Sequence, residues 1–167
     1  MNRKRRKKGE GMGDEAAWLS ERELRAWKNL LAVNSIIGRS VEQQLKDAAG
    51  LSHPQYEVLT RLGDAPGGEL RMTELAGAAL TSKSGLTYQV TQLEKAGLIR
   101  RSSCPSDDRG VVAVLTELGK ERLRAAAPGH AALVRELFVD GLGEREFDSL
   151  AAGLEALLDR LRGRCSS

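Results

Sequence analysis

The sequence predicts a mainly α-helical protein of one globular domain that carries a single small β-hairpin. Three observations indicate this class. Apolar residues recur at spacings of three and four along most of the chain, which is the period of an amphipathic helix. Two short β-branched segments flank a polar turn in the second half. Of the 167 residues, 41% are hydrophobic and 29% are charged, a balance typical of one globular domain and not of a disordered chain.

Residues 1–16 are expected to form a disordered basic tail. Six basic residues lie between Arg3 and Lys8, although the formal net charge of the whole chain is only +3. Removing those six charges from +3 leaves −3 for the rest, so the high pI is no evidence that the folded body is basic. The tail is either a solvated segment without a role or a flexible arm that adds contacts to phosphate groups.

The composition also predicts where the protein resides. No apolar run approaches the roughly 18 residues of a membrane span, and the N-terminus lacks the apolar region of a secretory signal. The two cysteines, Cys104 and Cys165, make no disulfide framework. We therefore expect a soluble, cytoplasmic protein without a membrane partner.

Two helices are expected in the first third of the chain. Apolar residues at helical spacing run from about Trp18 to Ala48, and Gly50 ends the pattern, as glycine often does just past a helix. Ser52 should begin the second helix as its N-cap. Gln55 lies three residues later and completes a capping box, and Pro54 falls in the first turn, where its missing N–H costs nothing.

A short helix, a polar turn and a longer helix follow. Leu70 and Met72 could form a short strand, and Thr73 should cap the short helix. Thr81 or Ser82 should cap the longer helix. The apolar face of that helix is expected to consist of Leu86, Val90, Leu93 and Gly97. This arrangement is a helix-turn-helix.

A β-hairpin comes directly after the second of these helices. Its strands are predicted in "LIRRSSC" and "GVVAVLT", around the polar turn "PSDDRG". A hairpin at this place makes the helix-turn-helix winged. Thr116 should cap a further helix, which Pro128 should kink or interrupt. An amphipathic helix of about residues 144–162 ends the chain.

The stretch "SKSGLTYQ" at the start of the longer helix is polar and narrow, as a helix needs to be when its first turns enter the major groove. Gly85 lets the groove wall approach, Gln89 can pair with adenine through two hydrogen bonds, and Tyr88 can bond a phosphate or pack on a sugar. The candidate DNA-binding residues of this helix are Ser82, Lys83, Ser84, Gly85, Thr87, Tyr88 and Gln89. The alternative is a solvated helix face.

The hairpin supplies a second set of candidates. With the helix in a major groove, Arg109 should project toward the neighbouring minor groove, where negative potential attracts a guanidinium group. Asp107 could brace Arg109 or cap the turn. One of Arg100 and Arg101 should face phosphate, and Arg101 is the candidate. The alternative for Arg109 is a solvated turn residue.

These segments resemble the MarR family of bacterial winged helix-turn-helix regulators. The resemblance rests on "LTSKSGLTYQVTQLEKAGLIRR", on "DDRG", which matches the D-x-R wing signature of that family, and on "VAVLTELGKERL". It implies a homodimer that binds a pseudo-palindromic operator in double-stranded DNA, usually as a repressor of transcription. It also implies release by a small anionic or phenolic effector or by thiol oxidation.

The resemblance divides the chain into five parts. They are the tail (1–16), an N-terminal dimerisation helix (17–50), a winged helix-turn-helix DNA-binding lobe (51–116), C-terminal dimerisation helices (117–162) and a short tail (163–167). The terminal helices carry long Leu/Ala stripes, more apolar surface than one small winged domain needs to cover, which agrees with a dimer. The alternative is that these stripes pack within one chain.

An effector pocket is expected between the dimerisation helices and the DNA-binding lobe. Trp27, His53 and Tyr56 are candidate lining residues, although all three are equally compatible with ordinary core or surface positions. Redox-sensing members of the family carry a reactive cysteine near the start of the first helix, and this chain has none there. Cys104 near Arg100 and Arg101 leaves a thiol-responsive regulator as an alternative.

Motifs of enzymes are missing from the sequence. There is no nucleophile elbow, Walker A loop, C-x-x-C or H-E-x-x-H, and "GEGMG" precedes no strand–helix unit. We therefore expect no catalysis, no cofactor and no bound metal. The remaining rival is an architectural or protein-binding winged-helix module without operator specificity.

Overall fold

The structure is a computed structural model that describes residues 18–78, 83–104 and 107–165. At Ala78, Lys83, Cys104, residues 107–109 and Cys165 it describes the backbone alone. The predicted basic tail and the expected caps Thr81 and Ser82 lie outside these ranges. The chain forms two units, residues 1–35 and residues 36–167.

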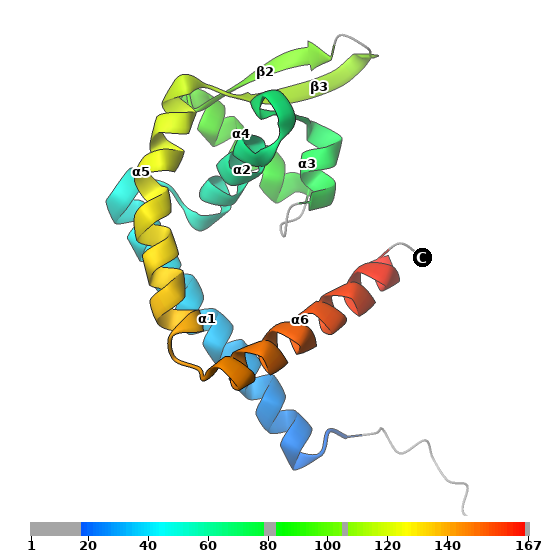
Figure 1. Ribbon diagram of the computed structural model, residues 1–167. Helices are drawn as coiled ribbons and strands as arrows, with labels where there is room; N and C mark the ends of the chain where they lie inside the picture. The colour runs from blue at the N-terminus through cyan, green and yellow to red at the C-terminus, as the bar shows by residue number, and fades with distance from the viewer. Residues whose placement is uncertain (1–17, 79–82, 105–106, 166–167) are drawn as a thin grey trace, which may run out of the picture. The chain divides into compact units, whose positions relative to one another are not determined.

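The order of elements matches the winged helix-turn-helix expected from the sequence (Figure 1). The elements are α1 (Glu21–Ala49), α2 (His53–Asp64), a 3₁₀ turn η1 (Pro66–Gly68), β1 (Glu69–Arg71), α3 (Met72–Ala78), α4 (Lys83–Lys95), β2 (Ile99–Cys104), β3 (Asp107–Leu115), α5 (Glu117–Val134), a π-helical turn η2 (Arg135–Val139) and α6 (Glu144–Cys165). Among the described residues, none of the helices is both long and apolar enough to cross a membrane.

The first unit contains the N-terminal part of α1. A reciprocal capping box begins this helix: the Ser20 N–H and hydroxyl both donate to Glu23 Oε2 at 2.7 Å, and Glu23 N–H donates to Ser20 Oγ at 3.3 Å. These bonds to the carboxylate lower the pKa of Glu23. The helix therefore begins at Glu21 because its first N–H groups are satisfied locally.

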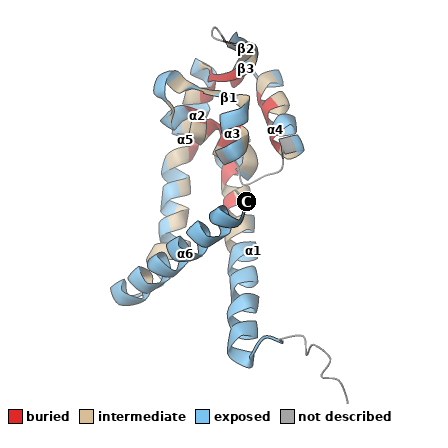
Figure 2. Cartoon of the chain, turned by 90° about the vertical axis from the view of Figure 1, so that its right-hand side faces the viewer, coloured by how far each residue is buried: buried red, intermediate tan, exposed pale blue. Residues whose placement is uncertain are grey.

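The core of the second unit lies where the winged lobe meets the last turns of α1. Val41, Leu45 and Ala49 of α1 are buried there. The rest of this core consists of Leu51, Val58, Leu59, Leu62, Leu75, Leu86, Val90, Leu93, Leu98, Ile99, Ala113, Leu115 and Ala126. In Figure 2 the buried positions gather in the lobe, whereas α6 is exposed along nearly its whole length.

The capping box predicted for α2 is confirmed. Ser52 Oγ accepts from Gln55 N–H at 3.4 Å, Gln55 Oε1 accepts from Ser52 N–H at 3.0 Å, and a proline lies in the first turn. This start was readable from sequence because both bonds join residues only three positions apart.

Two local expectations for the helix-turn-helix were wrong. Thr73 does not cap α3; the helix already begins at Met72, and Arg71 N–H donates back to Glu74 Oε2 at 3.0 Å. Gly97 is not on the apolar face of α4, because it lies past the helix end with φ +72°. There its N–H donates to the Glu94 carbonyl at 2.9 Å, and this left-handed turn ends the helix.

The interruption expected at Pro128 is absent. Helix α5 continues from Glu117 to Val134 with this proline inside it. Pro128 is exposed, so water can hydrate the carbonyl group that loses its N–H partner. The irregularity occurs instead after Val134, as the π-helical turn η2.

The three strands form one antiparallel sheet in the order β1-β3-β2. Leu70 of β1 pairs with Ala113, and Ile99 of β2 pairs with Leu115. The central strand β3 therefore holds both the segment that precedes the helix-turn-helix and the strand that follows it. The register between β2 and β3 shifts at Ser103 and Cys104, close to the end of the hairpin.

Candidate nucleic-acid interface

Helix α4 has one buried face and one exposed polar face. Leu86, Val90 and Leu93 are at most 2% exposed and hold the helix against the core. On the opposite side Ser84, Thr87 and Tyr88 are exposed, Tyr88 by 61%. Gly85 and Gln89 are half-buried, Lys83 begins the helix, and Ser82 lies outside the described residues. The buried positions agree with the sequence pattern, and contact of the polar face with DNA stays a prediction.

The hairpin of β2 and β3 projects from the lobe beside α4 (Figure 1). Asp107 is the first residue of β3 and is paired with Cys104. Arg109 lies two residues further along β3, still at the outer end of the hairpin. The backbone therefore puts Arg109 at the wing position expected from "DDRG", whereas the contacts of its side chain, and those of Asp107, are not described.

The two arginines at the start of β2 have different surroundings. Arg100 is exposed, whereas Arg101 is half-buried and turned toward α4. Arg101 Nη2 donates to Thr91 Oγ1 at 2.6 Å, and Arg101 Nε lies 3.4 Å from Glu94 Oε2. The side chain predicted to contact DNA thus has partners within the protein.

A separate cavity of about 320 Å³ lies between α2 and α5. The rings of Tyr56 and His130 meet in its wall with their centroids 4.8 Å apart. Burial, and then the proximity of His53, lower the pKa of His130. His130 Nδ1 is buried without a hydrogen-bond partner. The residues that line the cavity are His53, Tyr56, Glu57, Thr60, Arg61, Asp64 and His130.

The structure brings two of the three predicted pocket residues together. His53 and Tyr56 share the cavity, and Trp27 lies on the part of α1 that belongs to the first unit, where it is 52% exposed. Sequence reasoning missed His130 as a lining residue. No sequence signal could have found it, because only the packing of α2 on α5 places it beside Tyr56.

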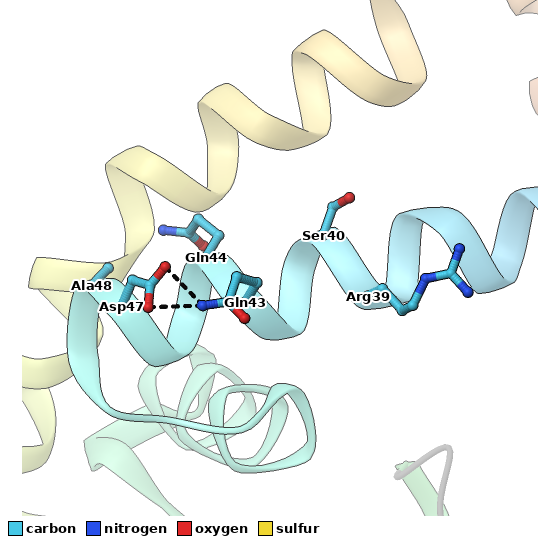
Figure 3. A pocket seen from close by; sticks show the side chains of 6 residues that line it. All are labelled: Arg39, Ser40, Gln43, Gln44, Asp47 and Ala48. Carbon is cyan, nitrogen blue, oxygen red and sulfur yellow. Dashed lines mark hydrogen bonds between the residues drawn. The ribbon is translucent and has the colours of Figure 1, made fainter.

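A larger concave surface of about 870 Å³ lies along α1 (Figure 3). Arg39, Ser40, Gln43, Gln44, Asp47 and Ala48 line it, so one helix supplies the whole surface. The Gln43 amide donates to both carboxylate oxygens of Asp47, at 2.9 and 3.0 Å (Figure 3). The Gln43 amide and the Asp47 carboxylate on this surface are therefore already hydrogen-bonded to each other. Within the described residues, no group of three or more His, Cys, Asp or Glu side chains could hold a metal ion.

Apolar side chains remain exposed on both terminal helices, each considered in its own unit. In the first unit Leu24, Trp27, Leu30, Leu31 and Val33 of α1 are 40–52% exposed. In the second unit the exposed leucines of α6 are Leu150, Leu154, Leu157, Leu158 and Leu161, at 37–49%. Rows of apolar residues of this length are typical of surfaces that a partner covers.

A helix-turn-helix that lies between β1 and β2 of a three-stranded sheet, with a hairpin projecting beside its second helix, is the arrangement of a winged-helix DNA-binding protein. The model of the MarR family matches residues 51–111. The MarR family transcriptional regulator Sco3205 of Streptomyces coelicolor, whose structure is in complex with DNA, is 38% identical, with a TM-score of 0.84 over 89% of this chain and 93% of Sco3205. The chain belongs to the MarR family of transcriptional regulators.

Two curated relatives match over shorter lengths. The transcriptional regulator HosA of Escherichia coli O111:H- is 36% identical over 78 residues, which are 47% of this chain and 56% of HosA. The HTH-type transcriptional repressor YetL of Bacillus subtilis (strain 168) is 30% identical over 112 residues, which are 67% of this chain and 66% of YetL. The chain thus spans less than two thirds of either relative.

Proposed function

We propose that this regulator is a sequence-specific repressor that binds a pseudo-palindromic operator as a homodimer and is released by a small molecule. In this proposal α4 enters the major groove with its face from Ser82 to Gln89. Arg109, braced by Asp107, enters the adjacent minor groove, and one of Arg100 and Arg101 contacts phosphate.

The observation that carries the proposal is the two-sided character of α4. Its apolar side chains are almost completely buried, so the helix is rigidly placed, and its first turns still expose a polar face with the aromatic ring of Tyr88. Side chains that read base edges need this combination of a fixed helix and an accessible N-terminal face. The DNA complex of Sco3205 supports the same use of the fold here.

The exposed leucines of α6 support a homodimer. Burying a fully exposed leucine contributes about 1.5–3 kcal/mol. These five leucines are 37–49% exposed, so each would add somewhat less than half of that on association, and a row of five per chain is still a substantial driving force. A two-fold dimer presents two copies of α4, which would read half-sites about one helical turn apart. Palindromic symmetry of the operator follows from this symmetry.

The cavity beside Tyr56 and His130 supports a small effector. Its volume of about 320 Å³ suits a single-ring compound. An aromatic ring can pack against the rings of Tyr56 and His130, and the polar side chains of the wall can bind a phenolic or carboxylate oxygen. We therefore infer a small anionic or phenolic ligand.

Selection of bound sequences from random duplex DNA, at near-physiological salt, tests the proposal. An inverted repeat whose half-site centres lie about one helical turn apart is the expected result. Binding without an enriched sequence, and lost as salt rises, would instead indicate an architectural module. The recovered operator then allows single-ring carboxylates and phenols to be screened for release of the protein.

Substitution of the wing arginine tests the minor-groove contact. Arg109→Ala should weaken operator binding by about 1–3 kcal/mol, measured by fluorescence anisotropy, with an unchanged melting temperature. Arg124→Ala on the exposed side of α5 is the matched control, because it removes the same charge from a position outside the DNA-binding lobe. Equal affinities of Arg109→Ala and the unsubstituted protein would exclude the wing from recognition.

A further inference from the structure

We propose that Arg101 does not bind DNA and instead fixes the wing to the recognition helix through Glu94 and Thr91, which leaves the phosphate contact to Arg100. The proposal rests on the proposed operator binding and assigns a positioning role within it. Three contacts from one residue of β2 to one face of α4 carry the argument.

The guanidinium group of Arg101 is directed at α4. Its Nη2 donates to Thr91 Oγ1 at 2.6 Å, and its Nε lies 3.4 Å from Glu94 Oε2. The Thr91 hydroxyl donates to the Thr87 carbonyl at 2.8 Å, so the lone pairs of its oxygen are left to accept from Arg101. Thr91 and Glu94 are three residues apart and therefore lie on the same face of the helix.

The backbone of Arg101 makes the third contact. Its N–H donates to Glu94 Oε1 at 3.2 Å. The strand order β1-β3-β2 makes β2 an edge strand, and an edge strand presents backbone groups that the sheet does not satisfy. The Glu94 carboxylate thus accepts a hydrogen bond from the open edge of the wing with one oxygen and forms an ion pair with the Arg101 side chain with the other. We call this set of three residues, Thr91, Glu94 and Arg101, the wing clamp.

The clamp lies at the base of the hairpin, so small movements there are magnified at its end. Arg101 is three residues from the end of β2 at Cys104, a distance of roughly 10 Å at about 3.3 Å per residue. A tilt of roughly 10° at the clamp would move that end by roughly 2 Å, which exceeds the width of the hydrogen-bonding range. Whether Arg109 reaches the minor groove therefore depends on the clamp.

Arg100 fits the phosphate contact better. Successive residues of a strand point to opposite faces, so Arg100 is turned away from the side on which Arg101 meets α4. It is exposed, whereas the Arg101 side chain is only 31% exposed and is held by Glu94. A guanidinium group that is already bound to a carboxylate and a hydroxyl would have to lose both partners before it could bind a phosphate.

The salt dependence of operator binding separates the two roles. The logarithm of the binding constant falls as the logarithm of the salt concentration rises. Each side chain that binds a phosphate contributes about 0.9 to the steepness of this fall, so losing it from both copies in a dimer should make the slope shallower by about 2. Arg100→Gln should show this reduction. Arg101→Gln should weaken operator binding roughly tenfold with the slope unchanged, because only the placement of the wing changes.

Two further variants make the test sharp. Glu94→Ala removes a negative charge, which would strengthen binding to DNA by charge alone, and we expect it to weaken operator binding about as much as Arg101→Gln. Arg101→Lys keeps the charge but cannot span both Thr91 and Glu94, so it should behave like Arg101→Gln. Circular dichroism and melting curves confirm that each variant is folded, and Arg101→Lys and Glu94→Gln serve if a larger change unfolds the protein.

Several results would overturn the wing clamp. These are a reduced slope for Arg101→Gln, normal affinity of Arg101→Lys, unchanged or tighter binding by Glu94→Ala, and an unchanged slope for Arg100→Gln. The unsubstituted protein is measured first against its selected operator. If the unsubstituted protein shows no operator preference, the proposed function is wrong and the wing clamp is wrong with it. If it does show a preference, the results for the variants test the wing clamp separately from the proposed function.

Discussion

Replacement of Gly119 by alanine tests how tightly the end of α4 is joined to α5. Gly119 is buried in the first turn of α5, and its N–H donates to the N-cap oxygen Thr116 Oγ1 at 3.1 Å. An added Cβ would overlap the carbonyl oxygen of Leu98, and it would lie 2.7 Å from Leu115 Cδ1. The Leu98 carbonyl belongs to the backbone just past α4, so no side-chain rotation can relieve the overlap.

The magnitude follows from what has to move. Overpacking of this kind costs about 1–3 kcal/mol. A shift of α5 also stretches the bonds from Thr116 N–H to the Leu98 carbonyl (3.1 Å) and from Thr116 Oγ1 to the Gly97 carbonyl (2.7 Å). Such bonds contribute about 0.5–1.5 kcal/mol each. Against these losses, alanine gains at most about 1 kcal/mol of helix propensity.

We therefore expect Gly119→Ala to lower the free energy of unfolding by about 2–4 kcal/mol and the melting temperature by roughly 5–15 °C. Urea and thermal unfolding followed by circular dichroism would measure both, at one fixed protein concentration because a dimer melts in a concentration-dependent way. Gly77→Ala in α3 is the matched control, since its Cβ would meet nothing within 4 Å and should stabilise the protein slightly. A Gly119→Ala protein as stable as the unsubstituted one would refute this reasoning.

Four further predictions concern other elements. Ser52→Ala removes the capping box of α2 and should cost about 1 kcal/mol in urea unfolding; a loss below a few tenths would show that the cap contributes little. The lowered pKa of His130 means that the unfolded chain binds this proton more readily, so the free energy of unfolding should fall as pH drops from above 6.5 through the lowered pKa. His130→Gln should flatten that part of the pH profile, and an unaltered profile would assign it to other groups. Leu157→Glu puts a charge in the exposed apolar row of α6 and should give a monomer by light scattering, whereas an intact dimer would remove this row from the interface. Gln89→Ala should relax preference at one base position in a repeated selection; uniform weakening would make Gln89 a backbone contact.

Local patterns carried most of the fold prediction. The capping box of Ser52 and Gln55 depends on residues three positions apart, and the period of Leu86, Val90 and Leu93 alone identifies the buried face of α4. Gly97 was misplaced because a glycine has no side chain to show on which side of a helix end it falls. Its positive φ decides this, and the sequence does not display that angle.

The site was less predictable where it depends on packing between distant segments. Arg100 and Arg101 are chemically alike, and only the position of β2 beside α4 determines which of them meets Glu94. His130 and Tyr56 are far apart in the chain, so their ring contact required the packing of α5 on α2. The sequence could name candidate residues for DNA contact, and the structure decided which have partners inside the protein.

The pairing of both β1 and β2 with β3 makes the segment between them, which contains α3 and α4, an exchangeable unit. The chain leaves the sheet after Arg71 and returns to it at Ile99, and both ends are hydrogen-bonded to the same short stretch of β3, Val112–Leu115. The intervening residues are thus a closed loop whose neck does not depend on which polar side chains α4 exposes. The exposed side chains of α4 can therefore be exchanged while the entropy of closing the loop stays constant, and under the proposed function such exchanges would change the base preference. A designer could do the same by transplanting only the exposed positions of α4 from another member of the family.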